Sequence, residues 1–382
     1  MSDFIFRISP NIVLGPYIIS RLGQQIKEWG NRYMVILDPL LNEAKLAEKI
    51  LQSLIDRKIE SFVFAEIAEG NSSKVIERAV KLAREGHVHG IIAVGGEKAM
   101  HIGRAVAALF HETHDLYTFI DGASPSTAAI PCICIPTTFR CPHCFTNTVP
   151  VTDSRSNQIK MMKVQNNLCK LVLIDPNLML SLTENQKATL SLELICMATE
   201  AYLSQKANFF SDMLVEKGLE ILSYALDGSP SLEISTPEEV LLSQAGVMIS
   251  LAAASSSLGL GSLLSLGISS RYHKSKSLVA SILLPFILED TAKFKASQLE
   301  KISRLLRTCP PETEGEDAVK ALIEYVRQKI AKYNLPTRLK DLQLSVENLS
   351  LTIEDVASID IINALPRSMS SDDLFSFIKV AY

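Results

Sequence analysis

A short apolar strand that ends in two glycines and runs directly into a helix is the feature that most constrains the fold. Residues 90–96 read Gly-Ile-Ile-Ala-Val-Gly-Gly, and a helical pattern follows from Lys98 to Phe110. Glycines let the backbone approach an anion closely, and a helix N-terminus offers free N–H groups and the positive end of its dipole. The turn therefore indicates a phosphate site, although it is neither the three-glycine dinucleotide fingerprint nor a P-loop.

Strand and helix patterns alternate through the first half of the chain. Strands are predicted at 33–38, 62–67, 91–94, 129–135 and 171–175, with helices at 43–55, 72–84 and 98–110. This alternation predicts a mostly parallel sheet covered on both faces, with ligands at the carboxyl ends of its strands. Because Asp38, Gly95–Gly96 and Thr137–Thr138 all follow strands, we expect them to converge.

Long helical patterns replace the strands after Pro176. They cover 185–205, 212–226, 237–266, 276–288, 316–332, 352–361 and 371–380. We therefore expect an α/β domain over residues 1–180 and an all-α domain over residues 181–382. Val240–Ser270 has no charged residue, but its serines and glycines favour one buried helix of the helical domain over a membrane span.

Charge and cysteine usage exclude several partners. The net charge is −4 and no segment is dense in Lys and Arg, which argues against nucleic acid as a partner. Met1–Arg7 interleaves charged and apolar residues and lacks the apolar core of a signal peptide. Seven scattered cysteines indicate reduced thiols, so we expect a cytoplasmic protein with no membrane association.

A series of short segments carries a family resemblance over the whole chain. In order they are Asn11–Gly15, Ile92–Gly96, Ile135–Thr138, Val151–Asp153, Leu173–Pro176, Glu200–Tyr202, Ala207–Asn208, Leu258–Gly259, Ile282–Pro285 and Leu365–Arg367. This order resembles the iron-containing (group III) alcohol dehydrogenases. The resemblance implies an α/β dinucleotide-binding domain followed by an all-α domain, the iron-type alcohol dehydrogenase and dehydroquinate synthase-like fold. It also implies a small-molecule substrate in the cleft between the domains, and a homodimer or larger homo-oligomer.

The metal positions implied by the resemblance are occupied by other residue types. Members of the family hold one divalent metal with an Asp and three His, and those positions fall here on Glu193, Met197, Leu266 and Lys276. An additional family His falls on Ser262. Met and Leu are poor ligands for such an ion, and an ammonium group repels it. We therefore expect no iron or zinc at the family site.

Lys276 and Glu193 indicate what replaces the metal. Lys276 would place a cation near the former metal position, with Glu193 as its counter-ion and Met197 and Leu266 filling the remaining volume. This pair is either structural, or Lys276 is catalytic as an electrophile, a general acid or a Schiff-base amine.

The nucleotide side of the resemblance is better kept. Asp38 after a strand favours NAD over NADP, because a carboxylate bonds the adenosine ribose and disfavours a 2′-phosphate. Gly95, Gly96, Thr137, Thr138 and Lys160 match family nucleotide contacts, with Lys160 one residue out of register. The turn departs from the family at Glu97, Lys98, His101 and Arg104. Glu97 would place a carboxylate near pyrophosphate, which costs affinity unless Lys98 or another cation offsets it.

The loop Phe139–Cys144, which replaces a Thr/Gly loop of the family, leaves several interpretations open. Cys141, His143 and Cys144, with His101 nearby in space, could bind a metal or carry a reactive thiol, or could simply pack. Cys132 and Cys134 alternate in a buried strand and are expected to be inert core.

Two functional classes follow. The first is an NAD-linked, metal-independent oxidoreductase of a small alcohol, aldehyde or ketone, with Lys276 polarising the carbonyl and His143 or His101 as proton donor. The second is a non-catalytic relative, a nucleotide-binding or assembly subunit. A Lys98 that binds pyrophosphate favours the first class, whereas a Glu97–Lys98 pair across an empty turn favours the second.

Overall fold

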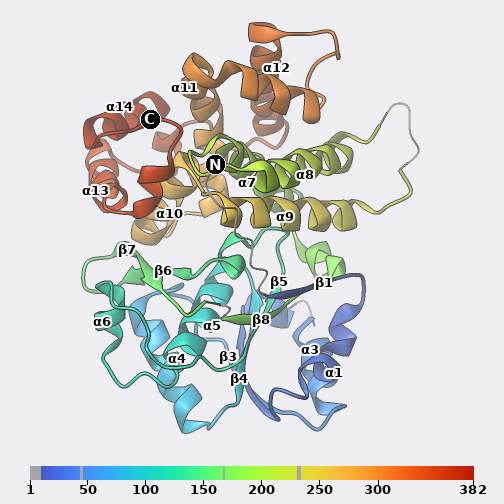
Figure 1. Ribbon diagram of the computed structural model, residues 1–382, viewed down its shortest axis with the longest axis vertical. Helices are drawn as coiled ribbons and strands as arrows, with labels where there is room; N and C mark the ends of the chain where they lie inside the picture. Colours follow the sequence, from blue (N-terminus) through green and yellow to red (C-terminus); the bar gives the residue numbers. More distant parts are fainter. Residues whose placement is uncertain (1–9, 44–45, 167, 230–233) are drawn as a thin grey trace. The chain divides into compact units, whose positions relative to one another are not determined.

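The computed structural model of the protein describes residues 10–43, 46–166, 168–229 and 234–382 (Figure 1). The chain divides into two compact units, Met1–Ser181 and Leu182–Tyr382, each with its own buried apolar core. The segment Met1–Arg7, on which the expectation about a signal peptide depends, lies outside the described residues.

The first unit is built on a six-stranded parallel sheet with strand order β1-β8-β5-β4-β2-β3. The strands are β1 (Asn11–Leu14), β2 (Arg32–Leu37), β3 (Glu60–Phe64), β4 (Gly90–Gly95), β5 (Cys132–Pro136) and β8 (Cys169–Ile174). Helices connect them: α1 (Leu22–Ile26), α2 (Leu40–Glu43), α3 (Leu46–Ile55), α4 (Ser73–Glu85), α5 (Glu97–Leu109) and α6 (Leu116–Ile120). Short 3₁₀ helices lie at η1 (Ile18–Arg21), η2 (Pro142–Phe145) and η3 (Pro176–Ser181).

Side chains alternate between the two faces of the central strands, as the two-residue period of a strand requires. On one face Val35, Ile92, Ile133 and Leu171 belong to an apolar core that also contains residues of α1 and α3. The other face carries Cys132 and Cys134 of β5, against which α5 packs. Both faces are therefore covered, which explains the nearly continuous apolar composition of β2, β4 and β5.

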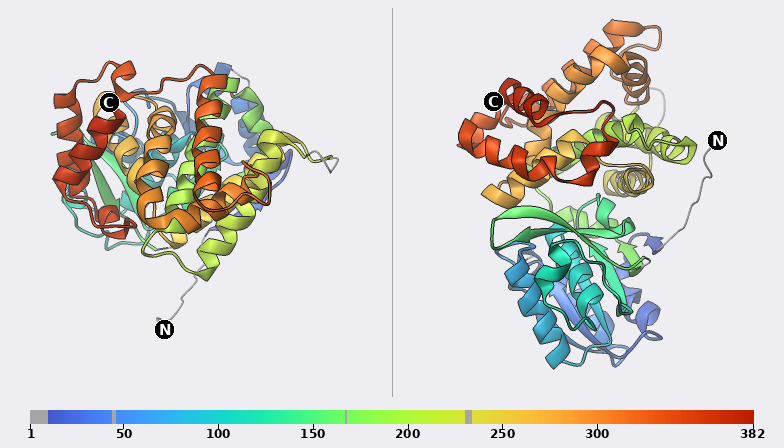
Figure 2. Two further views of the ribbon diagram at one scale, coloured as in Figure 1. Left: turned by 90° about the horizontal axis from the view of Figure 1, so that it is seen from above. Right: turned by 60° about the vertical axis from the view of Figure 1, so that its left-hand side comes forward.

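An antiparallel hairpin follows the sheet strand β5 and was not predicted. It consists of β6 (Thr148–Asp153) and β7 (Gln158–Lys163), with Val151 opposite Lys160 (Figure 2). These residues mix polar and apolar side chains without a clear alternating pattern, so no strand signal stands out there.

The described residues of the second unit form helices and their connections. The helices are α7 (Glu184–Leu203), α8 (Phe209–Asp227), α9 (Glu238–Ser255), α10 (Leu260–Tyr272), α11 (Lys276–Leu305), α12 (Gly315–Lys332), α13 (Val346–Ala357) and α14 (Ser371–Ala381), with 3₁₀ turns η4 (Leu339–Leu342) and η5 (Asp360–Ala364). Helix α7 packs against α8, α9, α10 and α11 and is buried almost all round. Helices α8 and α9 lie side by side (Figures 1 and 2). The expected α/β fold with an all-α C-terminal part is confirmed.

The prediction of one long helix over 237–266 is wrong. The charge-free segment forms α9 and α10, which meet at a bend of 97° because the chain leaves helical geometry between Ser256 and Gly259. Ser256 and Gly259 both have low helix propensity, and the glycine imposes least restraint on the backbone. Within the described ranges no single helix meets the length and apolarity of a membrane span, and only the bent pair α9–α10 does so jointly.

Candidate functional site

The carboxyl ends of three neighbouring strands bring the predicted nucleotide residues together. The Asp38 amide donates to the Val94 carbonyl at 3.0 Å, and the Thr137 amide donates to the Gly95 carbonyl at 3.0 Å. These bonds extend the pairing of β2 with β4 and of β4 with β5 beyond the last ladder residues. Asp38, Gly95 and Thr137 therefore lie side by side at the ligand-binding edge that parallel sheets use.

The two glycines of the turn differ in backbone conformation and in the space around them. Gly95 has a φ of 143°, and a β-carbon there would lie 2.7 Å from the β-carbon of Asp38. Gly96 precedes α5 with an ordinary φ of −75°, and a β-carbon there would meet nothing within 4 Å. Gly95 is thus required by the fold, whereas Gly96 leaves open space in front of the N-terminus of α5. An anion could approach the helix amides through this space.

Glu97 forms a buried ion pair with Arg140. An Arg140 guanidinium nitrogen lies 3.2 Å from Glu97 Oε1, and their side chains are only 7% and 11% exposed. The extra carboxylate of the turn therefore has a cation beside it, contributed by the loop after β5. Lys98 is exposed, and its aliphatic chain passes close to Gly70 in the loop before α4.

His101 and His143 meet on this side of the sheet. Their rings pack edge to face with centroids 5.1 Å apart, and both residues are 3% exposed. The side-chain amide of Asn71 lies 3.4 Å from His101 Nδ1 and donates to the Pro150 carbonyl at 2.6 Å. The sequence patterns did not single out Asn71. The available signal was its position in the loop between β3 and α4, immediately before the α4 N-cap Ser72.

Two other predicted nucleotide residues lie in less direct positions. The Thr138 hydroxyl donates to the Arg140 carbonyl at 3.2 Å, so it shapes the loop that carries Arg140. Lys160 lies on β7. Hydrogen bonds with Arg155, and the charges of Arg155 and Lys160, lower the pKa of Asp121.

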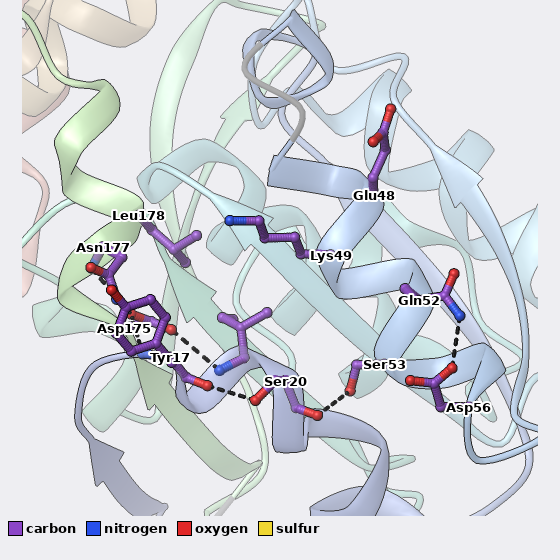
Figure 3. A pocket seen from close by; sticks show the side chains of 11 residues that line it. Tyr17, Ser20, Glu48, Lys49, Gln52, Ser53, Asp56, Asp175, Asn177 and Leu178 are labelled. Carbon is purple, nitrogen blue, oxygen red and sulfur yellow. Dashed lines mark hydrogen bonds between the residues drawn. The ribbon is translucent and has the colours of Figure 1, made fainter.

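A pocket of about 460 Å³ opens elsewhere in the first unit (Figure 3). It lies between α3, which contributes Lys49, and the segments that follow β1 and β8. The Asp175 carboxylate accepts from the amides of Tyr17 at 3.1 Å and Ile19 at 3.3 Å. Asp175 therefore ties these segments together, and its oxygens are already used by the fold.

The cysteines converge in a way that the sequence patterns did not indicate. Within the described ranges, the thiols whose sulfur atoms all lie within 4.8 Å of one another are Cys132, Cys134 and Cys169. A metal at Cys141, His143, Cys144 and His101 was one of three interpretations that the sequence left open, and these residues do not belong to that group. Hydrogen bonds with Cys132 and Cys134, together with the charge of Arg104, hold the pKa of Cys169 well below its ordinary range. Hydrogen bonds with Cys134 and Cys141 lower the pKa of Cys144 to about 6. Cys132 and Cys134 are fully buried, as expected.

In the second unit Lys276 and Glu193 form a buried ion pair. Lys276 Nζ lies 3.0 Å from Glu193 Oε1, and the two side chains are 8% and 1% exposed. Glu193 comes from the buried helix α7, and Lys276 is the first residue of α11, which packs against α7. The predicted counter-ion is therefore in place.

The four positions that the resemblance assigns to metal ligands do not fit iron or zinc. Met197 and Leu266 are buried at 0% and 7% exposure and present a thioether and a hydrocarbon. The carboxylate of Glu193 is paired with an ammonium group. Iron and zinc are bound by carboxylate, imidazole or thiolate donors, and a thioether, a hydrocarbon and an ammonium group supply none of these. The donor set therefore supports no step that runs through a metal at this position.

A second buried carboxylate lies further along α7. Glu200 accepts from the Ser262 amide at 3.0 Å and the Ser262 hydroxyl at 2.6 Å. Burial raises the pKa of Glu200, although the hydrogen bonds from Ser262 oppose this shift. The N-cap of α10 is Gly259, which has no side chain to cap the helix, so Glu200 supplies the acceptor from α7. Ser262, the position of the additional family His, thus serves a structural hydrogen bond.

A parallel sheet with a glycine turn at its carboxyl edge, followed by a helical unit, is the fold of a class of two-domain dehydrogenases. Comparisons with known proteins agree with this assignment. The profile of the iron-containing alcohol dehydrogenases matches residues 9–176, and that of the C-terminal part of the Fe-containing alcohol dehydrogenase family matches residues 187–382. The chain belongs to the iron-containing alcohol dehydrogenase family.

Similar individual proteins cover nearly the whole chain at low identity. The probable alcohol dehydrogenase EutG of Escherichia coli is 22% identical over 98% of this chain and 94% of its own length. Lactaldehyde reductase of the same species is 20% identical over 95% of this chain and 96% of its own. Among solved structures, a 1,3-propanediol oxidoreductase has a TM-score of 0.88 at 19% identity and covers 98% of each chain. The NADH-dependent butanol dehydrogenase A of Thermotoga maritima has a TM-score of 0.84 at 18% identity, covering 100% of this chain and 99% of its own. At these identities the structural likeness shows the fold.

Proposed function

We propose that the protein is an NAD-linked oxidoreductase that acts on a small alcohol, aldehyde or ketone without a metal ion at the family position. The observation that carries the proposal is the open space in front of Gly96 at the N-terminus of α5, beside Asp38. A helix N-terminus approached through glycine suits the pyrophosphate of a dinucleotide. The membership of the chain in a family of alcohol oxidoreductases supports the reaction class.

Asp38 supports NAD over NADP. It follows β2, which is paired with β4, and its β-carbon lies close to the turn at Gly95. A carboxylate at the end of a strand beside the glycine turn hydrogen-bonds the ribose hydroxyls of NAD and repels the 2′-phosphate of NADP. Lys98, exposed beside the turn, supports an anion-binding role.

The proposed chemistry balances without a metal. A bound reduced nicotinamide would supply the hydride for the carbonyl carbon, and the carbonyl oxygen would gain a proton to give the alcohol. Lys276 would supply the positive charge that stabilises the developing alkoxide, as a fixed cation does in such sites. His143 or His101 would supply the proton, because imidazole is the side chain that most often serves as a general acid.

The second candidate is a non-catalytic nucleotide-binding or assembly subunit. It is favoured by the apolar filling at Met197 and Leu266, since a buried Lys–Glu pair needs no catalytic purpose. The Glu97–Arg140 pair is compatible with both candidates. Arg140 offsets the negative charge of Glu97, which would otherwise repel pyrophosphate, but the pair also forms when no nucleotide is bound.

The glycine turn offers a direct test by calorimetric titration with NADH and NADPH. Gly96→Ala adds a methyl group to open space, so the variant should fold as the wild type does. Its methyl would occupy the path of the anion and should weaken NADH binding by about 10-fold, or ~1.4 kcal/mol. Gly15→Ala is the matched control, because Gly15 also follows a strand and a β-carbon there meets nothing within 4 Å.

Turnover and elemental analysis on the same samples separate the candidates. NADH binding with turnover of an alcohol or aldehyde by chelator-treated protein supports the metal-independent enzyme. NADH binding without turnover on a broad substrate panel supports the non-catalytic candidate. No nucleotide binding by the wild type contradicts the enzyme and the nucleotide-binding subunit alike.

We also propose a cytoplasmic location and a homodimer or larger homo-oligomer. The seven cysteines are thiols rather than disulfides, and six of them are buried, which supports a reducing compartment. Multi-angle light scattering on the purified chain tests the oligomer, and a monomeric mass would contradict it.

A further inference from the structure

Two adjacent strands place three thiols on one face of the sheet. Cys132 and Cys134 are two residues apart in β5 and so point to the same side. Cys169 begins β8 and is the direct partner of Cys132 across the ladder, where the register shifts by a bulge. All three belong to the covered interior of the first unit, with exposures of 0%, 0% and 3%.

The spacing of the three sulfur atoms is that of ligands around one ion. The Sγ atoms of Cys132 and Cys134 are 4.0 Å apart, and those of Cys134 and Cys169 are 3.6 Å apart. All three lie within 4.8 Å of one another. Tetrahedral zinc with Zn–S bonds of about 2.3 Å places its sulfur ligands about 3.8 Å apart.

A fourth thiol belongs to the loop after β5, next to these strands. Cys144 belongs to the short 3₁₀ turn η2, which contacts β8. Its thiol is 3% exposed and lies outside the group of three whose sulfur atoms are all within 4.8 Å of one another, so it would move closer to them to act as a ligand. The four thiols therefore come from β5, β8 and η2, and any ion that they share would fasten this loop to the sheet.

A buried guanidinium lies beside the cluster. Arg104 of α5 is 0% exposed and donates to the carbonyls of Thr146 and Thr148, the latter at 2.9 Å. Its Nε is buried without a hydrogen-bond partner, and in the part of the chain that the structure describes no carboxylate pairs with this guanidinium. Arg104 belongs to α5, which packs against β5. A buried cation without a carboxylate requires negative charge nearby, and thiolates around a metal would supply it.

We propose that Cys132, Cys134 and Cys169, with Cys144 as fourth ligand, form a structural site for zinc or a similarly thiophilic d¹⁰ cation, and that Arg104 offsets its excess negative charge. When the ion binds, each thiol loses its proton to solvent and forms a sulfur–metal bond, and neither sulfur nor metal is oxidised. Four thiolates and one Zn²⁺ leave two negative charges, of which Arg104 neutralises one. The positions that correspond to the family metal belong to the second unit, whereas these four thiols belong to the first.

The site would stabilise the loop that carries the residues facing the turn. Arg140, which pairs with Glu97, and His143, which packs on His101, both lie in the segment between β5 and Cys144. Because the ligands are buried, uptake of the ion accompanies folding.

Metal titration of reduced, chelator-treated protein tests the proposal. Cd²⁺ is the spectroscopic probe, since thiolate ligands give a charge-transfer band in the ultraviolet, and Zn²⁺ and Cu⁺ are then compared by competition with chelators. We expect one tightly bound equivalent in the wild type. Cys134→Ser/Cys169→Ser should weaken metal binding by about 100-fold or more. Loss of a group that only hydrogen-bonds to a metal ligand costs up to about 100-fold, and this variant removes two ligands themselves. Cys196→Ser/Cys309→Ser is the matched control, since both thiols lie in the second unit, and it should bind as the wild type does.

Substitution of Arg104 tests the site in a second way, because it changes metal affinity without removing a ligand. Arg104→Met should weaken the ion about 10-fold or more, whereas Arg104→Lys, which keeps the charge, should recover part of the affinity. A wild type without a thiolate charge-transfer band, or equal binding by the Cys134/Cys169 variant, would overturn the proposal. Mass spectrometry that found a disulfide among these cysteines in the resting protein would overturn it as well.

Discussion

Lys276 Nζ lies 3.0 Å from Glu193 Oε1 in the interior of the helical unit. Both residues occupy positions that the family resemblance assigns to metal ligands, and their ion pair joins α11 to α7. A buried pair of this kind contributes little net stability, but removal of one partner leaves an uncompensated charge.

The first prediction concerns this pair. Lys276→Met should lower the free energy of unfolding by about 3–5 kcal/mol, because the Glu193 carboxylate loses this cation in a buried position. Lys276→Met/Glu193→Leu should recover most of that loss in denaturant titrations. Lys320→Ala removes an exposed pair with Glu316 and should change stability by no more than ~0.5 kcal/mol. Equal losses in the single and double variants would contradict the coupling.

The second prediction restores the donor set. Glu193→Asp/Met197→His/Leu266→His/Lys276→His should gain a site for a divalent ion, because one carboxylate and three imidazoles replace an ion pair and two apolar groups. Titration with Co²⁺ should show d–d bands without sulfur charge transfer, which distinguishes this site from the cysteine cluster. If the variant folds and gains no such bands, the assignment of these positions is wrong.

The third prediction concerns the charge at the glycine turn. Arg140→Met takes this cation away from Glu97 and should weaken NADH binding by about 10-fold, or ~1.4 kcal/mol, through repulsion of the pyrophosphate. Glu97→Gln/Arg140→Met removes both charges and should bind close to the wild type by calorimetry. Unchanged affinity in Arg140→Met would show that Glu97 does not face the nucleotide.

The fourth prediction concerns Gly95. Gly95→Ala should destabilise the protein by about 1–3 kcal/mol, since its φ of 143° disfavours a side chain and the new methyl would approach the Asp38 β-carbon at 2.7 Å. Gly96→Ala should stay within ~0.5 kcal/mol of the wild type in thermal unfolding. Equal stability of the two variants would mean that the turn relaxes without cost.

The fifth prediction concerns pH. Burial raises the pKa of Glu200 above its ordinary value of 4.5, so the folded state prefers the protonated acid. The contribution of Glu200 to stability is therefore greatest below the unfolded pKa and is lost as the pH rises through the folded pKa. Glu200→Gln should flatten the decline of stability above about pH 4.5 relative to the wild type. Parallel pH profiles for the two proteins would contradict this origin.

Local sequence patterns were sufficient for most of the fold. The apolar runs at Tyr33–Leu37 and Ile91–Val94 lie in β2 and β4, and the glycine turn into the helix at Glu97 forms as expected. The hairpin β6–β7 and the bend between α9 and α10 were missed. The hairpin has no strong local signal, because such a short hairpin is decided by the neighbours it packs against. The bend falls at Ser256–Gly259, whose low helix propensity is a local signal that the continuous apolar pattern outweighed.

The sequence by itself determined that Asp38, Gly95 and Thr137 would meet, because residues that end adjacent parallel strands must share an edge. It also indicated the Lys276–Glu193 pair, through the residue types at the positions of a family metal. Only the tertiary structure decided that Glu97 pairs with Arg140 and that Cys169 joins Cys132 and Cys134 beside Arg104. These contacts join residues of separate elements, 35 positions apart for Cys134 and Cys169. Strand order and helix placement fix such distances, and no local pattern encodes them.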